Sequence, residues 1–314
     1  MPRTDSAARR HTGRSRRLRV VAAFAVLVAT GGYLAVQYLS GGKSSEQCTV
    51  QSADGSSGEG RTYRLNSEQA ANAATISAVG TARGMPERAV TIALATALQE
   101  SGLRNIEHGD RDSLGLFQQR PSQGWGTEKQ ILDPVYSAGK FYQHLAEVPG
   151  YSRLPLTVAA QRVQRSGFPQ AYAKHEPDAA LLAAVLTGRT PAALNCSPPR
   201  TTAGTGEASK VRAALVRTFG KDAAPAGDAA DSRTPAAGAT APGTLAVPVR
   251  STRDSGDGSA PQHGWELAHW AVAQSEALGI DEVAYGGRVW DAGSGWRDEG
   301  KESDTAEVRM RLVH

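Results

Sequence analysis

The sequence predicts a multidomain fold with a single N-terminal transmembrane helix, an all-α domain, a disordered linker and a small α+β C-terminal domain. Three observations lead to this prediction. An uncharged, mostly apolar segment follows an arginine-rich start, helical spacing of apolar residues runs through the first half, and a long stretch dominated by Ala, Gly, Thr and Pro follows it. With 314 residues and 40% hydrophobic content, the chain is long enough for one or two compact domains.

The N-terminus has the pattern of a membrane anchor. Residues 1–19 form a basic arm with seven arginines and one acidic residue, and residues 20–39 carry no charge. A helix of that length spans about 30 Å, the thickness of a bilayer core. A cleaved signal peptide is the alternative, but its apolar region is usually about 7–15 residues long. We therefore expect a single-pass protein of the cell membrane, with the arm cytoplasmic and the rest of the chain extracytoplasmic.

The distribution of charge argues against a nucleic-acid partner. The net charge of the chain is +4, and because the arm carries more positive charge than that, the external part is slightly acidic. A nucleic-acid-binding protein needs a basic face on its folded part. A single membrane span forms no transport path, so the sequence also excludes a transporter.

Composition divides the chain into six segments. They are a basic arm (1–19), an anchor (20–39), a Gly/Ser-rich spacer (40–61), a helical domain (62–196), a flexible linker (197–244) and an α+β accessory domain (245–314). The linker is too poor in large apolar residues to fold by itself. The exception is 207–219, which has helical spacing and is expected to be a transient helix or, alternatively, a docking segment. The accessory domain is expected to contain a strand at 245–249, a helix at 265–278, a hairpin across 283–290 and a strand at 308–313.

The only two cysteines, Cys48 and Cys196, flank the helical domain. In an oxidising exterior such a pair predicts a disulfide, which over 148 residues stabilises the fold by up to about 5 kcal/mol in the chain-entropy model. Two free thiols are the alternative. A metal site would need more ligands beside the cysteines than the sequence offers, so we expect no metal and no cofactor.

Local signals place the helices of the first domain. Asn66 and Gln69 form a capping box for a helix that ends near Gly84. The next helix begins near Pro86, and Asp133 followed by a proline is the N-cap of a later one. The chain between these elements has the Gly, Pro and Ser residues of loops.

Residues 91–118 carry the chemistry that we expect. An apolar helix ends at Glu100, a polar stretch follows, and a Gly-Leu-Phe-Gln tetrad at 115–118 returns the chain to the core. Glu100 then lies at the end of a buried helix and faces a loop. The negative pole of the helix dipole and partial desolvation both favour the protonated carboxyl, which suits a general acid. An exposed helix-end glutamate is the alternative.

Glu100-Ser101 at a helix end, followed by Ser-Leu-Gly-Leu-Phe-Gln at 113–118, resembles the lysozyme-like fold of lytic transglycosylases and goose-type lysozymes. The resemblance implies an enzyme that cleaves the glycan strands of peptidoglycan, with Glu100 as the acid and then the base. It also implies that Ser113 and Gln118 hydrogen-bond the substrate or orient Glu100. Gly115 would let the backbone come close to the sugar.

Further substrate-binding candidates lie downstream. Trp125 is in a loop, where it would stack on a sugar ring or, alternatively, close the edge of the domain. Many transglycosylases have an Ala-Tyr-Asn-Ala-Gly segment, but residues 159–167 of this chain read Ala-Ala-Gln-Arg-Val-Gln-Arg-Ser-Gly. Gln161 or Gln164 is the candidate for the missing amide, and Tyr172 is the candidate for the missing phenol.

Two other functions stay open at this point. A muramidase that uses water would need a second carboxylate, for which Glu107, Asp110 and Asp112 are the candidates. A non-catalytic peptidoglycan-binding or scaffold protein would keep the cleft without turnover.

The stretch 264–296 resembles the C-terminal half of an actinobacterial secreted module related to zinc-dependent D-Ala-D-Ala peptidases. The histidine-containing ligand segments of those modules are missing here, and His263 and His269 are too far apart along a helix to share a face. We therefore expect a non-catalytic accessory domain without a metal ion. Its tryptophans are expected in the core: Trp265, Trp270, Trp290 and Trp296.

Overall fold

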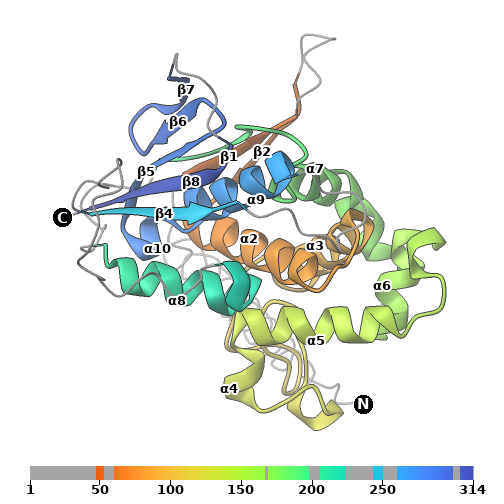
Figure 1. Cartoon of the computed structure of the whole chain (residues 1–314). Coiled ribbons are helices and arrows are strands. Elements are labelled where there is room, and N and C mark those ends of the chain that lie inside the picture. The colour runs from red at the N-terminus through yellow and green to blue at the C-terminus, as the bar shows by residue number, and fades with distance from the viewer. Residues whose placement is uncertain are drawn as a thin grey trace, which may run out of the picture. The chain divides into compact units, whose positions relative to one another are not determined.

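The computed structural model describes residues 47–52, 60–166, 169–197, 206–223, 243–249, 260–299 and 305–313 (Figure 1). Glu46–His314 form one compact unit. The basic arm and the apolar segment at 20–39 lie outside the described residues. Among the helices that are described, none is long and apolar enough to cross a membrane.

The fold class predicted for the first domain is wrong, because this domain is not all-α. It contains an antiparallel three-stranded sheet in the order β2-β1-β3. The strands are β1 (Cys48–Gln51), β2 (Thr62–Leu65) and β3 (Leu194–Cys196). Strands of three or four residues are too short to show an alternating pattern, and the sheet joins the two ends of the domain, so local patterns did not reveal it.

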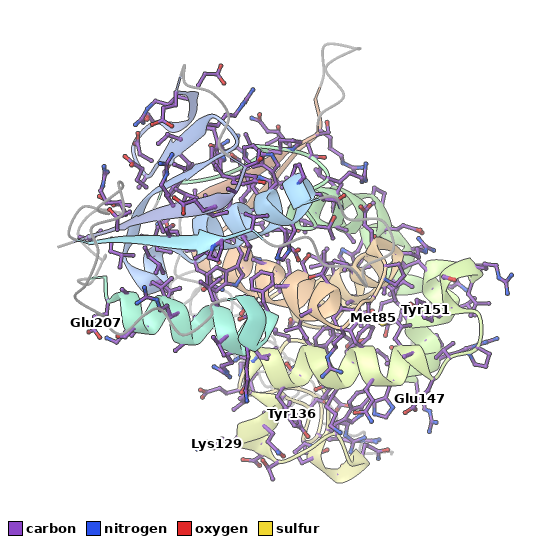
Figure 2. The ribbon with its side chains drawn as sticks, in the orientation of Figure 1. Met85, Lys129, Tyr136, Glu147, Tyr151 and Glu207 are labelled. Carbon is purple, nitrogen blue, oxygen red and sulfur yellow. A yellow bond between two sulfur atoms is a disulfide. The ribbon has the colours of Figure 1, made fainter. Side chains whose placement is uncertain are left out.

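Helices make up the rest of the first domain. The longer ones are α2 (Ser67–Ala82), α3 (Glu87–Ser101), α5 (Pro134–Ala146), α6 (Leu156–Gln164) and α7 (Glu176–Leu186). The shorter ones are α4 (Glu128–Ile131) and the 3-10 helices η2 (Pro121–Gln123), η3 (Tyr151–Arg153) and η4 (Pro169–His175). The predicted capping box at Asn66 and Gln69 is confirmed, and so is the N-cap at Asp133, whose side chain accepts from two backbone N–H groups. In Figure 2, Glu147 marks the end of α5 and Tyr151 the start of η3.

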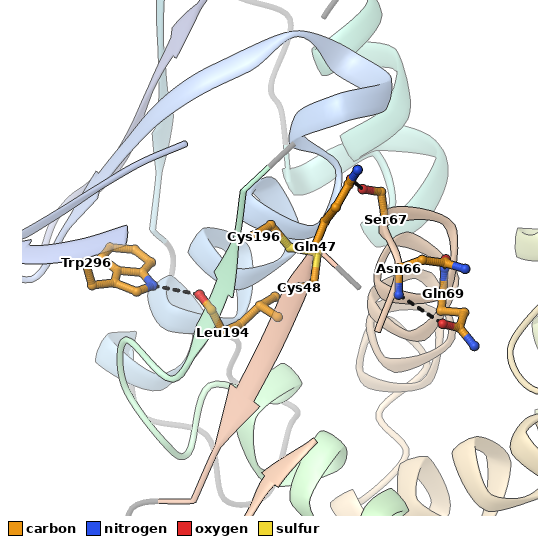
Figure 3. Close-up of a disulfide and its surroundings, with 8 residues drawn as sticks. All are labelled: Gln47, Cys48, Asn66, Ser67, Gln69, Leu194, Cys196 and Trp296. Carbon is orange, nitrogen blue, oxygen red and sulfur yellow. Dashed lines mark hydrogen bonds between the residues drawn. A yellow bond between two sulfur atoms is a disulfide. The ribbon is translucent and has the colours of Figure 1, made fainter. Parts of the chain in front are cut away.

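The predicted disulfide is confirmed, since Cys48 and Cys196 are bonded. The two cysteines are register partners in adjacent strands, so the bond joins β1 directly to β3 (Figure 3). Both side chains are fully buried or nearly so. The bond therefore staples the first strand of the domain to the last.

The prediction of a disordered linker is wrong for one part of it. The stretch for which a transient helix was preferred over a docking segment forms α8 (Ala208–Phe219), which is followed by the short 3-10 helix η5 (Lys221–Ala223). Val211 and Leu215, one helical turn apart, are fully buried, and α8 packs against α2. The stable helix depends on this tertiary contact, which supplies the apolar burial that the segment lacks by itself.

The C-terminal part is a five-stranded antiparallel sheet in the order β4-β8-β5-β6-β7, packed against α9. Its elements are β4 (Thr244–Pro248), α9 (Ala260–Ala273), α10 (Ser275–Leu278), β5 (Ile280–Tyr285), β6 (Arg288–Asp291), β7 (Gly295–Asp298) and β8 (Glu307–Leu312). The predicted hairpin is confirmed: β5 and β6 pair around Gly286 and Gly287, both of which have the positive φ that such a turn requires. Trp265, Trp270 and Trp290 are buried, whereas Trp296 is half-buried.

Helix α9 also packs on the first domain, against α2 and α7 (Figure 1). Gln262 donates to the carbonyl of Thr187 over 3.1 Å, and Thr81 donates to the carboxylate of Glu266. Strand β7 contacts β3 of the first domain, where the indole N–H of Trp296 donates to the carbonyl of Leu194 over 2.8 Å (Figure 3). Polar and apolar contacts thus join the sheet of the C-terminal part to the strand that carries the disulfide.

His269 lies fully buried at the centre of this contact. Its Nδ1 donates to the carbonyl of Val185 over 2.7 Å, and its Nε2 accepts from the backbone N–H of Ala193 over 3.3 Å. An imidazole that accepts through one nitrogen must be neutral. Burial lowers the pKa of His269 to about 4, and the bond to Val185 opposes part of this shift.

This buried histidine predicts a loss of stability in mild acid. Unfolding restores the ordinary pKa of His269, so the unfolded state binds the extra proton first as the pH falls below about 6.5. The stabilisation is complete above that pH and is lost between about pH 6.5 and 4, which amounts to roughly 3 kcal/mol. Urea unfolding across this range should show the decrease in wild type and a flatter profile in His269→Gln. The control is His108→Gln, which changes an exposed histidine and should keep the wild-type profile. An identical pH dependence in wild type and His269→Gln would contradict the assignment.

Candidate functional site

Glu100 lies in the last turn of α3, as predicted. The helix is buried on nearly all sides, and Gly102 ends it in the left-handed conformation with φ 63°. The Glu100 side chain is half-buried and reaches the cleft described below. Ser101 holds the following loop against the helix, because its hydroxyl donates to the carbonyl of Leu116 over 2.8 Å.

Tyr172 provides the closest partner of the Glu100 carboxyl. It lies on η4, its side chain is fully buried, and its hydroxyl donates to Glu100 Oε1 over 2.6 Å. Burial and the neighbouring carboxyl raise the pKa of Tyr172 far above its ordinary value, so the phenol keeps its proton as a donor. The phenol expected from the sequence is therefore beside Glu100.

The amide beside Glu100 comes from Gln164 at the end of α6. Its Nε2 donates to the carbonyl of Phe117 over 2.7 Å, and its side chain also hydrogen-bonds Glu100. The other candidate, Gln161, donates instead to the carbonyl of Ser166 over 2.8 Å. Of the two glutamines, only Gln164 therefore contacts the carboxyl, and it links Glu100 to the apolar tetrad.

Burial raises the pKa of Glu100, and the hydrogen bonds from Tyr172 and Gln164 oppose part of the rise. The two effects act on different states of the carboxyl. Desolvation favours the protonated acid, whereas the two donors stabilise the carboxylate once the proton has left. Such a group can give up a proton and later take one back.

Glu100 opens into a pocket of about 840 Å³. One wall is the loop between α3 and α4, and the other is formed by the ends of α5 and α6. Four of the predicted site residues meet here: Glu100, Ser113, Gln118 and Trp125. The sequence did not predict several other lining residues, among them His144, Glu147, Arg162 and Arg165.

Gly115 lies close to the backbone of α4. It is not part of the pocket lining, and a Cβ at this position would lie 2.8 Å from the carbonyl oxygen of Ile131. Its φ of 73° also disfavours any other residue. The glycine thus allows the loop to approach helix α4, and its proposed closeness to a sugar stays a prediction.

Trp125 packs against the core and also borders the pocket, so its sugar-stacking role stays a prediction. Its ring packs on His144 with the ring centroids 4.5 Å apart, and it is half-buried against the core. It also lines the pocket, so part of the ring remains available for a flat apolar ligand surface.

The other carboxylates differ in their availability. Asp112 accepts hydrogen bonds from the side chain of Ser122, from the backbone N–H of Ser122 over 2.8 Å and from Arg120 Nε over 2.7 Å. These bonds hold the pKa of Asp112 well below its ordinary value. Glu107 is not part of the lining. Asp110 and Glu147 line the pocket together with Glu100, and they are the second carboxylates that the structure brings to it.

The parts of the chain that the structure describes contain no group of three His, Cys, Asp or Glu side chains placed to hold a metal ion. His263 pairs with Glu266 on α9, with Nδ1 3.0 Å from the carboxylate, and His269 is occupied by two backbone groups. His263 is therefore paired within α9, and His269 serves the contact between α9 and the first domain.

One comparison with known proteins is positive. Residues 207–308 match the family model described as VldE, C-terminal domain. The match begins one residue before α8 and ends at the second residue of β8, so it takes in α8, α9, α10 and the strands β4 to β7. It does not reach the domain that carries Glu100, for which the lysozyme-like resemblance stays a prediction. No curated protein matches the chain.

Proposed function

We propose that this chain is an extracytoplasmic cell-wall protein that cleaves the glycan strands of peptidoglycan in the manner of a lytic transglycosylase, with Glu100 as acid and base. The observation that carries the proposal is the half-buried Glu100 carboxyl, with a raised pKa, in a large open cleft beside a phenol and an amide. Ser113, Gln118 and Trp125 surround the same space. The buried disulfide is consistent with an oxidising location.

The proposed reaction needs one carboxyl. Protonated Glu100 donates its proton to the glycosidic oxygen while the bond from that oxygen to the anomeric carbon breaks, and the N-acetyl group of the substrate supports the cationic sugar. The Glu100 carboxylate then accepts the proton of the 6-hydroxyl, whose oxygen bonds to the anomeric carbon to give a 1,6-anhydro sugar. Tyr172 and Gln164 stabilise the carboxylate between the two steps.

Two alternatives make different use of the same cleft. In a muramidase, Asp110 or Glu147 would act with Glu100 on a water molecule, and both line the pocket. In a binding protein, the cleft would hold the glycan without cutting it. Peptidoglycan is the proposed partner in all three cases.

Digestion of purified sacculi by the full-length chain separates these functions. A lytic transglycosylase releases fragments that end in a 1,6-anhydro sugar, and a muramidase releases fragments with a reducing end. A binding protein sediments with the sacculi and releases neither. The absence of anhydro products from sacculi that a known transglycosylase digests would refute the proposal.

The phenol of Tyr172 predicts a shift in the pH profile. In Tyr172→Phe the carboxylate loses a donor, so the pKa of Glu100 rises further, and the alkaline decline of kcat/KM should move to higher pH. Activity should also fall by about tenfold to a hundredfold, since the charge on the carboxylate is less well stabilised. Tyr151→Phe, which removes a hydroxyl outside the pocket, is the matched control. A reduced rate without a shifted profile would indicate that Tyr172 acts only through packing.

A further inference from the structure

Positive charge gathers on the walls of the cleft. Four arginines line it: Arg111 and Arg120 on the loop side, and Arg162 and Arg165 on the side of α6. The acidic residues of the lining are Asp110, Glu147 and Glu100 itself. Because the raised pKa of Glu100 favours its neutral form, the arginines outnumber the remaining negative charges.

The arginines on the two walls differ in their partners. On the loop wall, Arg120 Nε lies 2.7 Å from Asp112, and Arg111 Nε lies 4.0 Å from Asp110. Within the described residues, neither Arg162 nor Arg165 forms an ion pair at this distance or closer, and both side chains are exposed. The charge of the loop wall is thus largely balanced, whereas that of the α6 wall is not.

Arg162 and Arg165 both lie at the C-terminal end of α6. Arg162 is in the last turn of the helix, and Arg165 is its C-cap residue, in the left-handed conformation with φ 52°. Both residues line the pocket. Gln164, between them, reaches Glu100. Basic residues near a helix C-terminus also interact favourably with the helix dipole. That interaction does not explain why Arg162 and Arg165 both line the pocket.

An occupant of the cleft would cover part of this wall. Covering two guanidinium groups with neutral sugar rings removes water from them without supplying acceptors of matching charge, which is unfavourable. A carboxylate offers two acceptor oxygens to the planar guanidinium group of an arginine, and these replace the hydrogen bonds that water made to it. The wall therefore favours a ligand that carries carboxylates.

We propose that Arg162 and Arg165 form a carboxylate-recognising subsite, so that the cleft selects an acidic glycan strand over a neutral polymer of N-acetylglucosamine. The inference rests on the proposed function, since it takes the ligand to be a glycan. The carboxylate can come from the lactyl group of a peptide-free strand or from an attached stem peptide. Both present the same group to the guanidinium pair.

The test measures binding rather than cleavage, with the full-length chain carrying Glu100→Gln so that no ligand is turned over. Three ligands of equal length are compared: chitin oligosaccharide, peptide-free peptidoglycan strands and strands with stem peptides. We expect at least one of the acidic strands to bind about tenfold more tightly than chitin oligosaccharide at low ionic strength, and less so at high ionic strength. Whichever acidic strand is preferred identifies the source of the carboxylate.

The added Arg162→Gln/Arg165→Gln change should reduce this preference to about twofold or less and leave the affinity for chitin oligosaccharide unchanged. Arg153→Gln removes an exposed arginine outside the pocket and should retain the preference. An undiminished preference in the double variant, no binding of any strand, or tighter binding of poly(glycerol phosphate) would overturn the proposal. If the wild-type chain prefers acidic strands but does not cleave them, the proposed enzymatic function is wrong and the proposed subsite is still supported.

Discussion

Replacing Glu100 with glutamine should reduce the release of anhydro fragments from sacculi by about a hundredfold to ten-thousandfold, the range of a lost general acid–base. Glutamine has nearly the same shape, and its carbonyl oxygen can still accept the hydrogen bond that Tyr172 makes to Glu100 Oε1. The melting temperature should therefore stay close to that of wild type. The measurement is chromatographic separation of the soluble fragments after digestion, with circular dichroism as the check on folding.

Two matched variants decide whether Glu100 acts alone. Asp110→Asn and Glu147→Gln neutralise the other carboxylates of the lining. If the substrate's own N-acetyl group supports the reaction, both variants should keep activity within about tenfold of wild type, whereas a general base that activates water is worth about a hundredfold or more. A large loss in either variant, with reducing ends in the remaining products, would replace the transglycosylase by a muramidase. Full activity of Glu100→Gln would remove Glu100 from the chemistry.

Removing the disulfide should lower the free energy of unfolding by about 3–5 kcal/mol, because the bond closes a separation of 148 residues. The cysteines pair in register across β1 and β3, and β3 also receives the indole N–H of Trp296 through the carbonyl of Leu194. In Cys48→Ser/Cys196→Ser, urea unfolding should therefore begin at lower denaturant concentration. Loss of the β1–β3 pairing should also loosen the contact with β7.

The control for this experiment is the wild-type chain after reduction and alkylation, which should be destabilised to a similar extent. Hydrogen exchange at the backbone amides of β1 and β3 would show whether the strands separate locally before the rest of the unit unfolds. Equal stability of the oxidised protein and the double variant would mean that the sheet holds without its covalent link.

Much of the fold was accessible from short stretches of sequence. The Asn66 capping box, the Asp133 N-cap and the Gly286-Gly287 hairpin each depend on residues within a few positions of one another, and the structure confirms them. The three-stranded sheet was not predicted, and α8 was expected to be transient rather than docked, for the opposite reason. Their stability comes from partners far away in the chain, which no local pattern records.

Some residues of the candidate site were also predictable from short stretches of sequence, and others were not. Glu100, Ser113, Gln118 and Trp125 come from one continuous stretch, and the sequence placed them together before the structure did so. The choice between Gln161 and Gln164 depended on the tertiary structure, because only the folded chain shows which amide lies beside the Glu100 carboxyl. Nothing in the sequence around Arg162 and Arg165 indicated that these two residues line the pocket.

The sequence by itself determined the apolar helix that ends at Glu100, the polar loop and tetrad after it, and the cysteine pair, because helix periodicity, capping and composition act over short range. Tertiary structure decided which distant groups surround the carboxyl. Tyr172 hydrogen-bonds it from 72 residues downstream, and burial among these elements raises its pKa. Proton affinity depends on the solvent and donors around a group, and these exist only once the chain has folded.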